Sequence, residues 1–172
     1  MKRAFRLSII SCLCLLPLIL ASCSGWHLRG SESAGPSLKS NVFISGERGE
    51  TYRIVEQNLS GKNLLSSALN SDLLLDLGRE NIKRRSASTN SDATTAEFEL
   101  TLTLDYAIRD DQQNLLRPKN TIRITRSYNF NQDSIGSSNK EETLLRIDLQ
   151  RAAARQIMQQ LTLLDRLRNK SN

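Results

Sequence analysis

Strict alternation of apolar and polar side chains runs through residues 97–109 and is the clearest pattern in the chain. The apolar positions are Phe98, Leu100, Leu102, Leu104, Tyr106 and Ile108, and Ala107 alone interrupts the polar positions between them. Because side chains of a β-strand point alternately to its two faces, this segment is predicted to form a strand with one buried face. Residues 121–130 alternate in the same way, except that Arg126 occupies an apolar position. The two segments are predicted to pair as an antiparallel hairpin through a turn over residues 110–120, where Pro118 disfavours a helix.

Two other segments have apolar residues at steps of three and four, which is the spacing of an amphipathic helix. The first covers residues 50–70, and Gly61 is expected to break it, because glycine costs about 1 kcal/mol relative to alanine inside a helix. The second covers residues 140–168, with acidic residues near its start and basic residues near its end, as the helix dipole favours. The apolar positions are Ile54, Val55, Leu59, Leu65 and Leu69 in the first segment and Leu145, Leu149, Ala153, Ile157 and Leu161 in the second.

Two further strands are expected before the hairpin. Residues 41–45 form a short β-branched and aromatic run before Gly46. Residues 72–85 are rich in leucine and fit either a longer helix or a buried strand, of which we favour the strand. Residues 86–95 and 132–139 are predicted loops. The resulting order β-α-β-β-β-α predicts an α+β fold with one domain, in which a four-stranded mixed sheet has two helices packed on one face.

The N-terminal segment has the parts of a bacterial secretion signal. Basic residues come first, an uncharged apolar run follows over residues 7–19, and small residues precede Cys23. The sequence Leu20-Ala21-Ser22-Cys23 resembles the lipobox of bacterial lipoproteins, which implies cleavage before Cys23, acylation of this cysteine and, with Ser24 after it, delivery to the outer membrane. The alternatives are an ordinary secretory signal and a transmembrane helix, for which the apolar run is shorter than the ~20 residues that a bilayer requires.

Removal of the signal peptide, residues 1–22, changes the composition that matters for function. The remaining 150 residues suffice for one domain, and the net charge falls from +6 to +3, because three basic residues are removed. So small an excess, in a secreted protein, argues against nucleic acid as the partner. Within the mature chain, residues 23–40 are predicted to be a lipidated tether, residues 41–168 the folded domain and residues 169–172 a disordered tail.

The residues of the mature chain give little support to catalysis. His27 is its one histidine, and acylation of Cys23 leaves no thiol. A single histidine cannot build a zinc site of the usual spacings. The sequence also has no glycine-rich phosphate loop and no nucleophile elbow. We therefore predict a protein that is not an enzyme and that has no metal or other cofactor.

The candidate binding residues are mostly basic. The run Lys83-Arg84-Arg85 stands at a predicted strand end, and Arg117, Lys119 and Arg123 stand around the predicted hairpin turn. Arginine suits phosphate and carboxylate groups, but such charges also keep sheet edges soluble. Arg126 needs a partner, a bulge or a ligand, because an unpaired buried charge is costly. Trp26, in the tether, suits either the headgroup layer of a membrane or a docking contact.

Several short motifs together resemble the LptE family of lipopolysaccharide-assembly lipoproteins. The lipobox cysteine is followed by Gly25-Trp26-His27-Leu28-Arg29-Gly30, and Thr95-Ala96-Glu97-Phe98, Arg126-Ser127-Tyr128 and the alanine-rich segment 151–157 follow in the family's order. The resemblance implies a four-stranded sheet with two helices, and a lipid-anchored protein on the periplasmic side of the outer membrane. It also implies a role as a plug inside the β-barrel LptD and as a lipopolysaccharide-binding subunit.

The same resemblance points to ligand-binding positions in two loops. At the first, the matching residue is Ser91, so Lys83, Arg84 and Arg85 are the nearest basic residues; the second falls at Lys140. These four residues are the predicted lipopolysaccharide contacts. The alternative is a free outer-membrane lipoprotein, which would serve as a pilot for another barrel or secretin or as a periplasmic interaction module.

Overall fold

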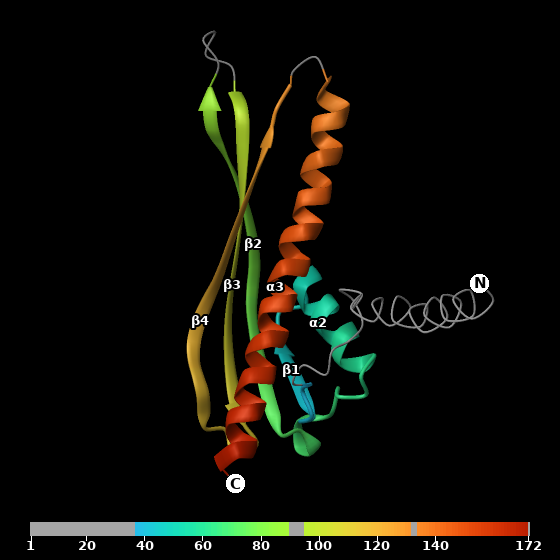
Figure 1. Cartoon of the computed structure of the whole chain (residues 1–172), viewed down its shortest axis with the longest axis vertical. Helices are drawn as coiled ribbons and strands as arrows, with labels where there is room; N and C mark the ends of the chain where they lie inside the picture. The colour runs from blue at the N-terminus through green and yellow to red at the C-terminus, as the bar shows by residue number, and fades with distance from the viewer. Residues whose placement is uncertain (1–36, 90–94, 132–133, 172) are drawn as a thin grey trace, which may run out of the picture. The chain divides into compact units, whose positions relative to one another are not determined.

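The computed structural model describes residues 37–89, 95–131 and 134–171. In chain order the elements are β1 (Val42–Gly46), α2 (Glu50–Ser60), the short 3₁₀-helix η2 (Ala68–Asn70), β2 (Leu73–Thr89), β3 (Thr95–Asp110), β4 (Leu115–Asn129) and α3 (Ile135–Ser171). The strands lie in the order β1-β2-β3-β4, with β1 parallel to β2 and the other neighbours antiparallel (Figure 1). Glu80 of β2 accepts hydrogen bonds from Thr51 of α2 and Gln150 of α3, which places both helices on one face of the sheet. The predicted α+β fold is confirmed.

Alternation along β3 gives the sheet two unlike faces. Leu100, Leu102 and Leu104 are buried under the helices, whereas Thr101 and Thr103 point to the opposite face. No helix of the described part covers that opposite face, which we call the outer face. Its central residues are Asn81, Lys83 and Arg85 of β2, Glu99, Thr101 and Thr103 of β3, and Arg123 and Thr125 of β4. The strand predicted over residues 97–109 is therefore confirmed together with its buried face.

Strand β2 is longer than the sequence predicts. Leu73, Leu75 and Leu77 are buried in the core, which confirms the strand over the alternative helix. The strand then continues to Thr89, so the loop predicted from residue 86 is wrong over its first four residues; residues 90–94 lie outside the described part. Pairing with β3 keeps this serine-rich segment extended, because a long neighbouring strand outweighs a weak local β-propensity.

The turn between β3 and β4 is also shorter than predicted. Asp110 accepts hydrogen bonds from the backbone and side-chain nitrogens of Asn114, at 2.8 and 3.0 Å, and Gln113 adopts a left-handed φ of 66°. Strand β4 begins directly afterwards, at Leu115, and contains Pro118. Proline is tolerated there because β4 is an edge strand with a single neighbour, so a missing N–H does not interrupt a ladder.

Helix α2 ends at Ser60, and Gly61 follows it as the sequence predicts. Tyr52, Val55 and Leu59 are buried. The helical spacing beyond Gly61 was misleading, because Val42 of β1 exchanges backbone hydrogen bonds with Leu64 and Ser66, which holds that segment extended. Leu65 and Leu69, predicted as helical core positions, are exposed.

Helix α3 begins earlier and ends later than residues 140–168. Its core positions are confirmed, since Leu149, Ala153, Ile157 and Leu161 are buried. The predicted disordered tail is wrong over residues 169–171, which remain helical; the side-chain amide of Asn169 donates to Asp165, one turn earlier, at 3.0 Å. The residues that the structure describes include no helix of the length and apolar character needed to cross a membrane.

The last residues of the predicted tether belong to the folded domain. Leu38 is buried in the core. The backbone N–H of Lys39 donates to Asp165 at 2.9 Å, and the hydroxyl of Ser40 donates to the same carboxylate at 2.5 Å. Burial opposes the ionisation of Asp165, but the hydrogen bonds from Ser40, Lys39 and Asn169 outweigh it and lower the pKa of this carboxyl. The domain therefore starts at about residue 38, joined to the C-terminal part of α3.

Candidate functional site

The basic run Lys83-Arg84-Arg85 lies inside β2 rather than at its end. Successive side chains of a strand point to opposite faces, so the run is divided between the two faces of the sheet. Lys83 and Arg85 stand on the outer face, opposite Thr101 and Glu99 of β3. Arg84 stands opposite buried Leu100, on the face that carries the helices. The side chains of the run are thus divided between two faces of the sheet, although Arg84 also borders the groove on the outer face that is described below.

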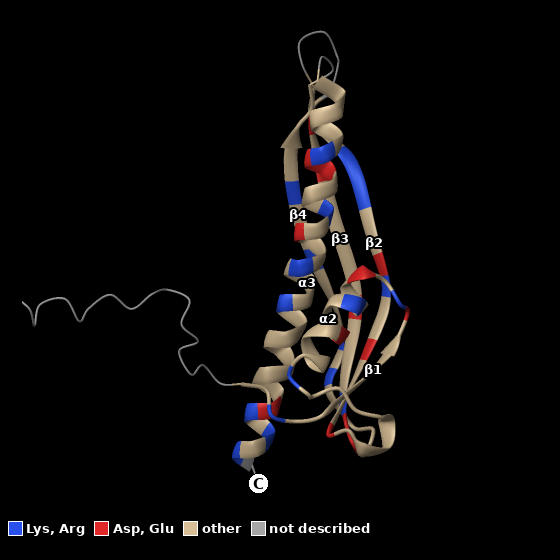
Figure 2. Ribbon diagram, turned by 90° about the vertical axis from the view of Figure 1, so that its right-hand side faces the viewer, with Lys and Arg blue, Asp and Glu red and all other residues tan. Residues whose placement is uncertain are grey.

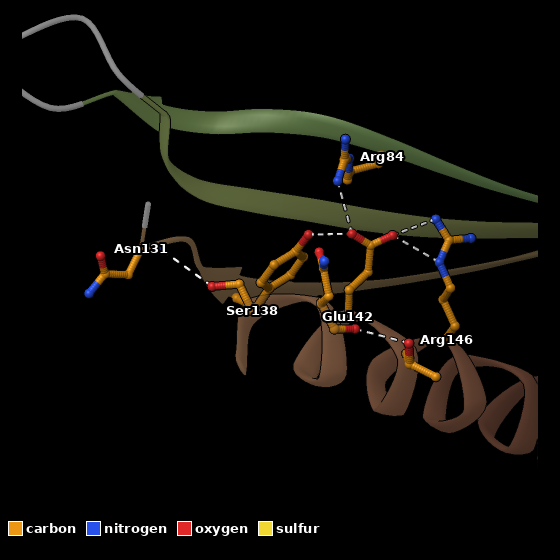
Figure 3. Close-up of polar contacts among 8 residues, drawn as sticks. Arg84, Asn131, Ser138, Glu142 and Arg146 are labelled. Carbon is orange, nitrogen blue, oxygen red and sulfur yellow. Dashed lines mark hydrogen bonds and ion pairs between the residues drawn. The ribbon is translucent and has the colours of Figure 1, made fainter. Parts of the chain in front are cut away.

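Arg84 belongs to a network centred on Glu142 of α3 (Figure 3). Its guanidinium group donates to Glu142 Oε2 at 3.0 Å, and the hydroxyl of Tyr128, from β4, donates to the same oxygen at 2.5 Å. Arg146, one helical turn after Glu142, donates to Oε1 through two nitrogens at 3.0 and 2.7 Å. The network therefore joins β2 and β4 to α3 through one carboxylate.

The charge of Glu142 is held by these donors. Burial of the carboxyl raises its pKa, but the hydrogen bonds from Tyr128, Arg146 and Arg84 outweigh burial and lower the pKa of Glu142 to about 2. Burial likewise raises the pKa of the Tyr128 hydroxyl, and its hydrogen bond to Glu142 adds to that rise. The carboxylate stays ionised and the phenol stays protonated at neutral pH, so this network is a structural clamp.

Aromatic rings extend the clamp. The guanidinium carbon of Arg84 lies 4.5 Å from the centre of the Phe98 ring, a cation–π distance. The Phe98 ring also contacts Tyr128 and Phe130, with ring centres 5.8 and 5.2 Å away. Arg84 is thus in contact with a carboxylate and an aromatic face. These contacts identify it as a residue that holds α3 to the sheet.

A groove on the outer face contains Lys83 and Arg85. It has a volume of about 530 Å³, and Arg123 of β4 and Thr101 of β3 also line it. Arg85 donates to both oxygens of Glu99, at 2.7 and 3.0 Å, and these hydrogen bonds lower the pKa of the partly exposed Glu99 carboxyl. Lys83 and Arg123 form no ion pair with the residues that the structure describes. The groove therefore presents two available cations beside hydroxyl groups.

Arg123 was placed near the hairpin turn by the sequence pattern. Because β4 begins at Leu115, Arg123 lies well inside the strand, opposite Thr103. The polar alternation of Arg123, Thr125 and Ser127 is the sequence signal for this position. The ion pair between Glu142 and Arg146 could also have been predicted from the sequence, because the two residues are four positions apart on a helix, a spacing that favours ion pairs.

Arg126 has the partner that its apolar position requires. Its Nε lies 3.0 Å from Asp148 Oδ2 of α3, and its Nη1 donates to the carbonyl oxygen of Thr125, also at 3.0 Å. The side chain is 40% exposed, so the cation is partly solvated instead of fully buried. Arg126 therefore adds a second link between β4 and α3.

Among the remaining predicted positions, Lys140 lies in the described part and is not brought to the groove. Lys140 is exposed near the start of α3 and belongs to the helix layer, with the sheet between it and the outer face. Cys23, Trp26 and Ser91 lie outside the described residues. In the described part, no group of three histidine, cysteine or acidic side chains is arranged to hold a metal ion.

Comparison with known proteins gives one family match and several solved structures of similar fold. The model of the LptE family, described as lipopolysaccharide-assembly, matches residues 40–161. Lipoprotein B from Nitrosomonas europaea is similar over 80% of this chain and 90% of its own, with 23% identity and a TM-score of 0.65. The rare lipoprotein B from Shewanella oneidensis is similar over 77% of this chain and 100% of its own, with 21% identity and a TM-score of 0.63. A minor lipoprotein from Acinetobacter baumannii is similar over 74% of this chain and 94% of its own, with 21% identity and a TM-score of 0.59. At these identities the solved structures support the fold alone.

Proposed function

This chain belongs to the LptE family of lipopolysaccharide-assembly proteins, and we propose that it is an outer-membrane lipoprotein that plugs and helps assemble an LptD-like β-barrel. The family match carries this proposal, because it covers all four strands and most of α3. The anchor is the lipidated Cys23, which holds the domain on the periplasmic side of the membrane. The role is one of binding and positioning, without catalysis.

The outer face supports a place inside a barrel. The lumen of a membrane β-barrel is polar, so a plug needs polar surface that packs against it without leaving charges unpaired. The outer face provides polar surface, with a hydrogen bond of 3.1 Å between the hydroxyls of Thr101 and Thr125 and the paired charges of Arg85 and Glu99 beside it. Lys83 and Arg123 have no ion pair in the described part of the chain, so they are left to pair with acidic groups of the barrel or of a ligand. In the alternative, a free lipoprotein, the outer face would contact only solvent.

An affinity pull-down from detergent-solubilised outer membrane tests the plug. The tagged, lipidated protein should recover one large β-barrel near a one-to-one ratio. As a second readout, Lys83 on the outer face should react with an amine reagent in the free protein and be protected in the recovered complex. Recovery of the lipoprotein alone, from membranes that contain the barrel, would refute the plug and favour a free lipoprotein.

For lipopolysaccharide, we propose Lys83 and Arg85 as contacts, with Arg123 beside them. Lipid A and the inner sugars carry phosphates, which arginine and lysine bind well. Lys83 and Arg123 have no ion pair in the described part of the chain to give up. The guanidinium group of Arg85 is largely exposed in its pair with Glu99, and ion pairs at the surface contribute little to stability. Arg84 is held in the clamp with Glu142, so it is not proposed as a contact. Lys140 stays a separate candidate on α3.

Paired substitutions separate these roles. The Lys83→Ser/Arg85→Ser variant should weaken lipopolysaccharide binding several-fold, more so at low salt, with an unchanged melting temperature. Arg84→Ser is the matched control: it should lower the melting temperature and leave binding by the folded protein nearly unchanged. If the double variant binds as tightly as the natural protein, the site is elsewhere, and Lys140→Ser is then the variant to measure.

A further inference from the structure

The C-terminal part of α3 carries exposed leucines next to exposed cations. Leu163 and Leu167 are 41% and 57% exposed and lie one helical turn apart. Arg166 and Lys170, also one turn apart, are exposed beside them. Lys62, which follows α2, lines a groove together with Leu163 and Arg166. We call these five residues the terminal surface.

The cations of the terminal surface have no acidic partner among the residues that the structure describes. The neighbouring carboxylate, Asp165, is buried and accepts hydrogen bonds from Lys39 and Ser40. Figure 2 shows basic segments gathered at this end of α3 around one acidic segment, whereas several acidic segments alternate with basic ones at its other end. The surface therefore combines available positive charge with exposed apolar side chains. That combination is the one by which helices lie on an anionic lipid surface.

The position of the surface in the chain points to the same partner. The folded domain starts at Leu38, which is buried, and the next two residues are bonded to Asp165 of α3. Leu163, Arg166 and Leu167 lie within one helical turn of that carboxylate. The 14 steps from residue 23 to residue 37 span at most ~50 Å when fully extended. The other end of α3, 30 residues from Asp165, is a further ~45 Å away along the helix. A lipid on Cys23 is thus joined to the domain beside the C-terminal part of α3, and the opposite end of the helix lies a further ~45 Å from this junction.

We propose that the terminal surface lies on the membrane leaflet that holds the lipid anchor. Leu163 and Leu167 enter the boundary between headgroups and acyl chains, while Lys62, Arg166 and Lys170 contact the phosphates of anionic phospholipids. This contact sets the direction in which the sheet points away from the membrane, and so the end of the domain that first meets a partner. The inference rests on the lipid anchor included in the proposed function.

Lipid-borne quenching of a fluorophore tests the contact in the lipidated protein. The Leu167→Cys and Leu144→Cys variants are labelled with the same thiol-reactive fluorophore. Leu144 is the matched control, because it is 67% exposed on the same helix and far from the terminal surface. Each protein is reconstituted into vesicles of phosphatidylethanolamine and phosphatidylglycerol that contain a spin-labelled lipid. We expect at least three-fold stronger quenching at residue 167 than at residue 144, and weaker quenching at residue 167 in vesicles of phosphatidylcholine alone.

Charge reversal completes the test. The double change Arg166→Glu/Lys170→Glu should bring quenching at residue 167 down to the level at residue 144, whereas the same reversals at Lys140 and Arg151 should leave it unchanged. Equal quenching at residues 167 and 144, or quenching that the Arg166→Glu/Lys170→Glu change does not alter, would overturn the proposal. A protein that does not float with the vesicles at all would instead show that the anchor of the proposed function is missing, so the two failures are distinguishable.

Discussion

Replacing Glu142 by glutamine removes a carboxylate charge that faces two guanidinium groups and keeps the shape of the side chain. The Glu142 side chain is 15% exposed, while those of Arg84 and Arg146 are 46% and 39% exposed. The pKa of Glu142 falls from an ordinary value of 4.5 to about 2. At ~1.4 kcal/mol per pKa unit, that difference sets an upper bound of ~3.4 kcal/mol on the stability that the Glu142 carboxylate contributes at neutral pH. Because the arginines are partly solvated, we expect a measured loss of about 2 kcal/mol.

The pH dependence follows from the direction of the shift. The folded state binds the proton of Glu142 less readily than the unfolded state, so the contribution is complete above the unfolded pKa of about 4.5. It is lost as the pH falls through the folded pKa of about 2. The difference in stability between the natural protein and Glu142→Gln should therefore be constant from pH 7 to pH 5 and should narrow by roughly half at pH 3.

Thermal unfolding followed by circular dichroism measures this difference. A loss of ~2 kcal/mol corresponds to a fall of roughly 4–8 °C in the melting temperature of a domain of this size. Glu141→Gln is the matched control, because Glu141 is the exposed neighbour on the same helix and should change the melting temperature by less than ~1 °C. If Glu142→Gln melts like the control at pH 7, or if its deficit is the same at pH 3, the carboxylate does not hold α3 to the sheet.

Three further changes test other parts of the fold. Gly46→Ala should destabilise the protein by at least ~2 kcal/mol in urea unfolding, because Gly46 has a φ of 115° and an added Cβ would lie 1.9 Å from the carbonyl oxygen of Leu77. A stability within ~0.5 kcal/mol of that of the natural protein would contradict this geometry. Asp165→Asn should lower the stability by ~1–2 kcal/mol at pH 7 and by progressively less as the pH falls below about 4, since hydrogen bonding lowers the pKa of this carboxyl. Limited proteolysis near residue 38 should also become faster, and an unchanged cleavage rate would argue against the attachment of Lys39 and Ser40 to Asp165. Arg126→Ala and Asp148→Ala should show a coupling below ~1 kcal/mol in a double-mutant cycle, because both side chains are about 40% exposed, and a larger coupling would indicate a buried pair.

The sequence was sufficient for features set by local pattern. The alternation of Phe98 to Ile108 identified the central strand and its buried face, because a period of two residues is the geometry of a strand. The spacing of Leu149, Ala153, Ile157 and Leu161 identified the core face of α3 for the corresponding reason. The order of these elements was enough for the fold class, and short motifs were enough for the family.

Only the tertiary structure decided features that depend on partners distant in the sequence. The strand over residues 86–89 exists because β3 supplies its backbone partners, and residues 64–66 are extended because Val42 of β1 pairs with them. The structure also separated Arg84 from Lys83 and Arg85, and it paired Arg84 and Tyr128 with Glu142. Periodicity states which side chains share a face of one element. It does not state which neighbour that face meets or which charge a neighbour supplies, because that depends on how the strands and helices pack.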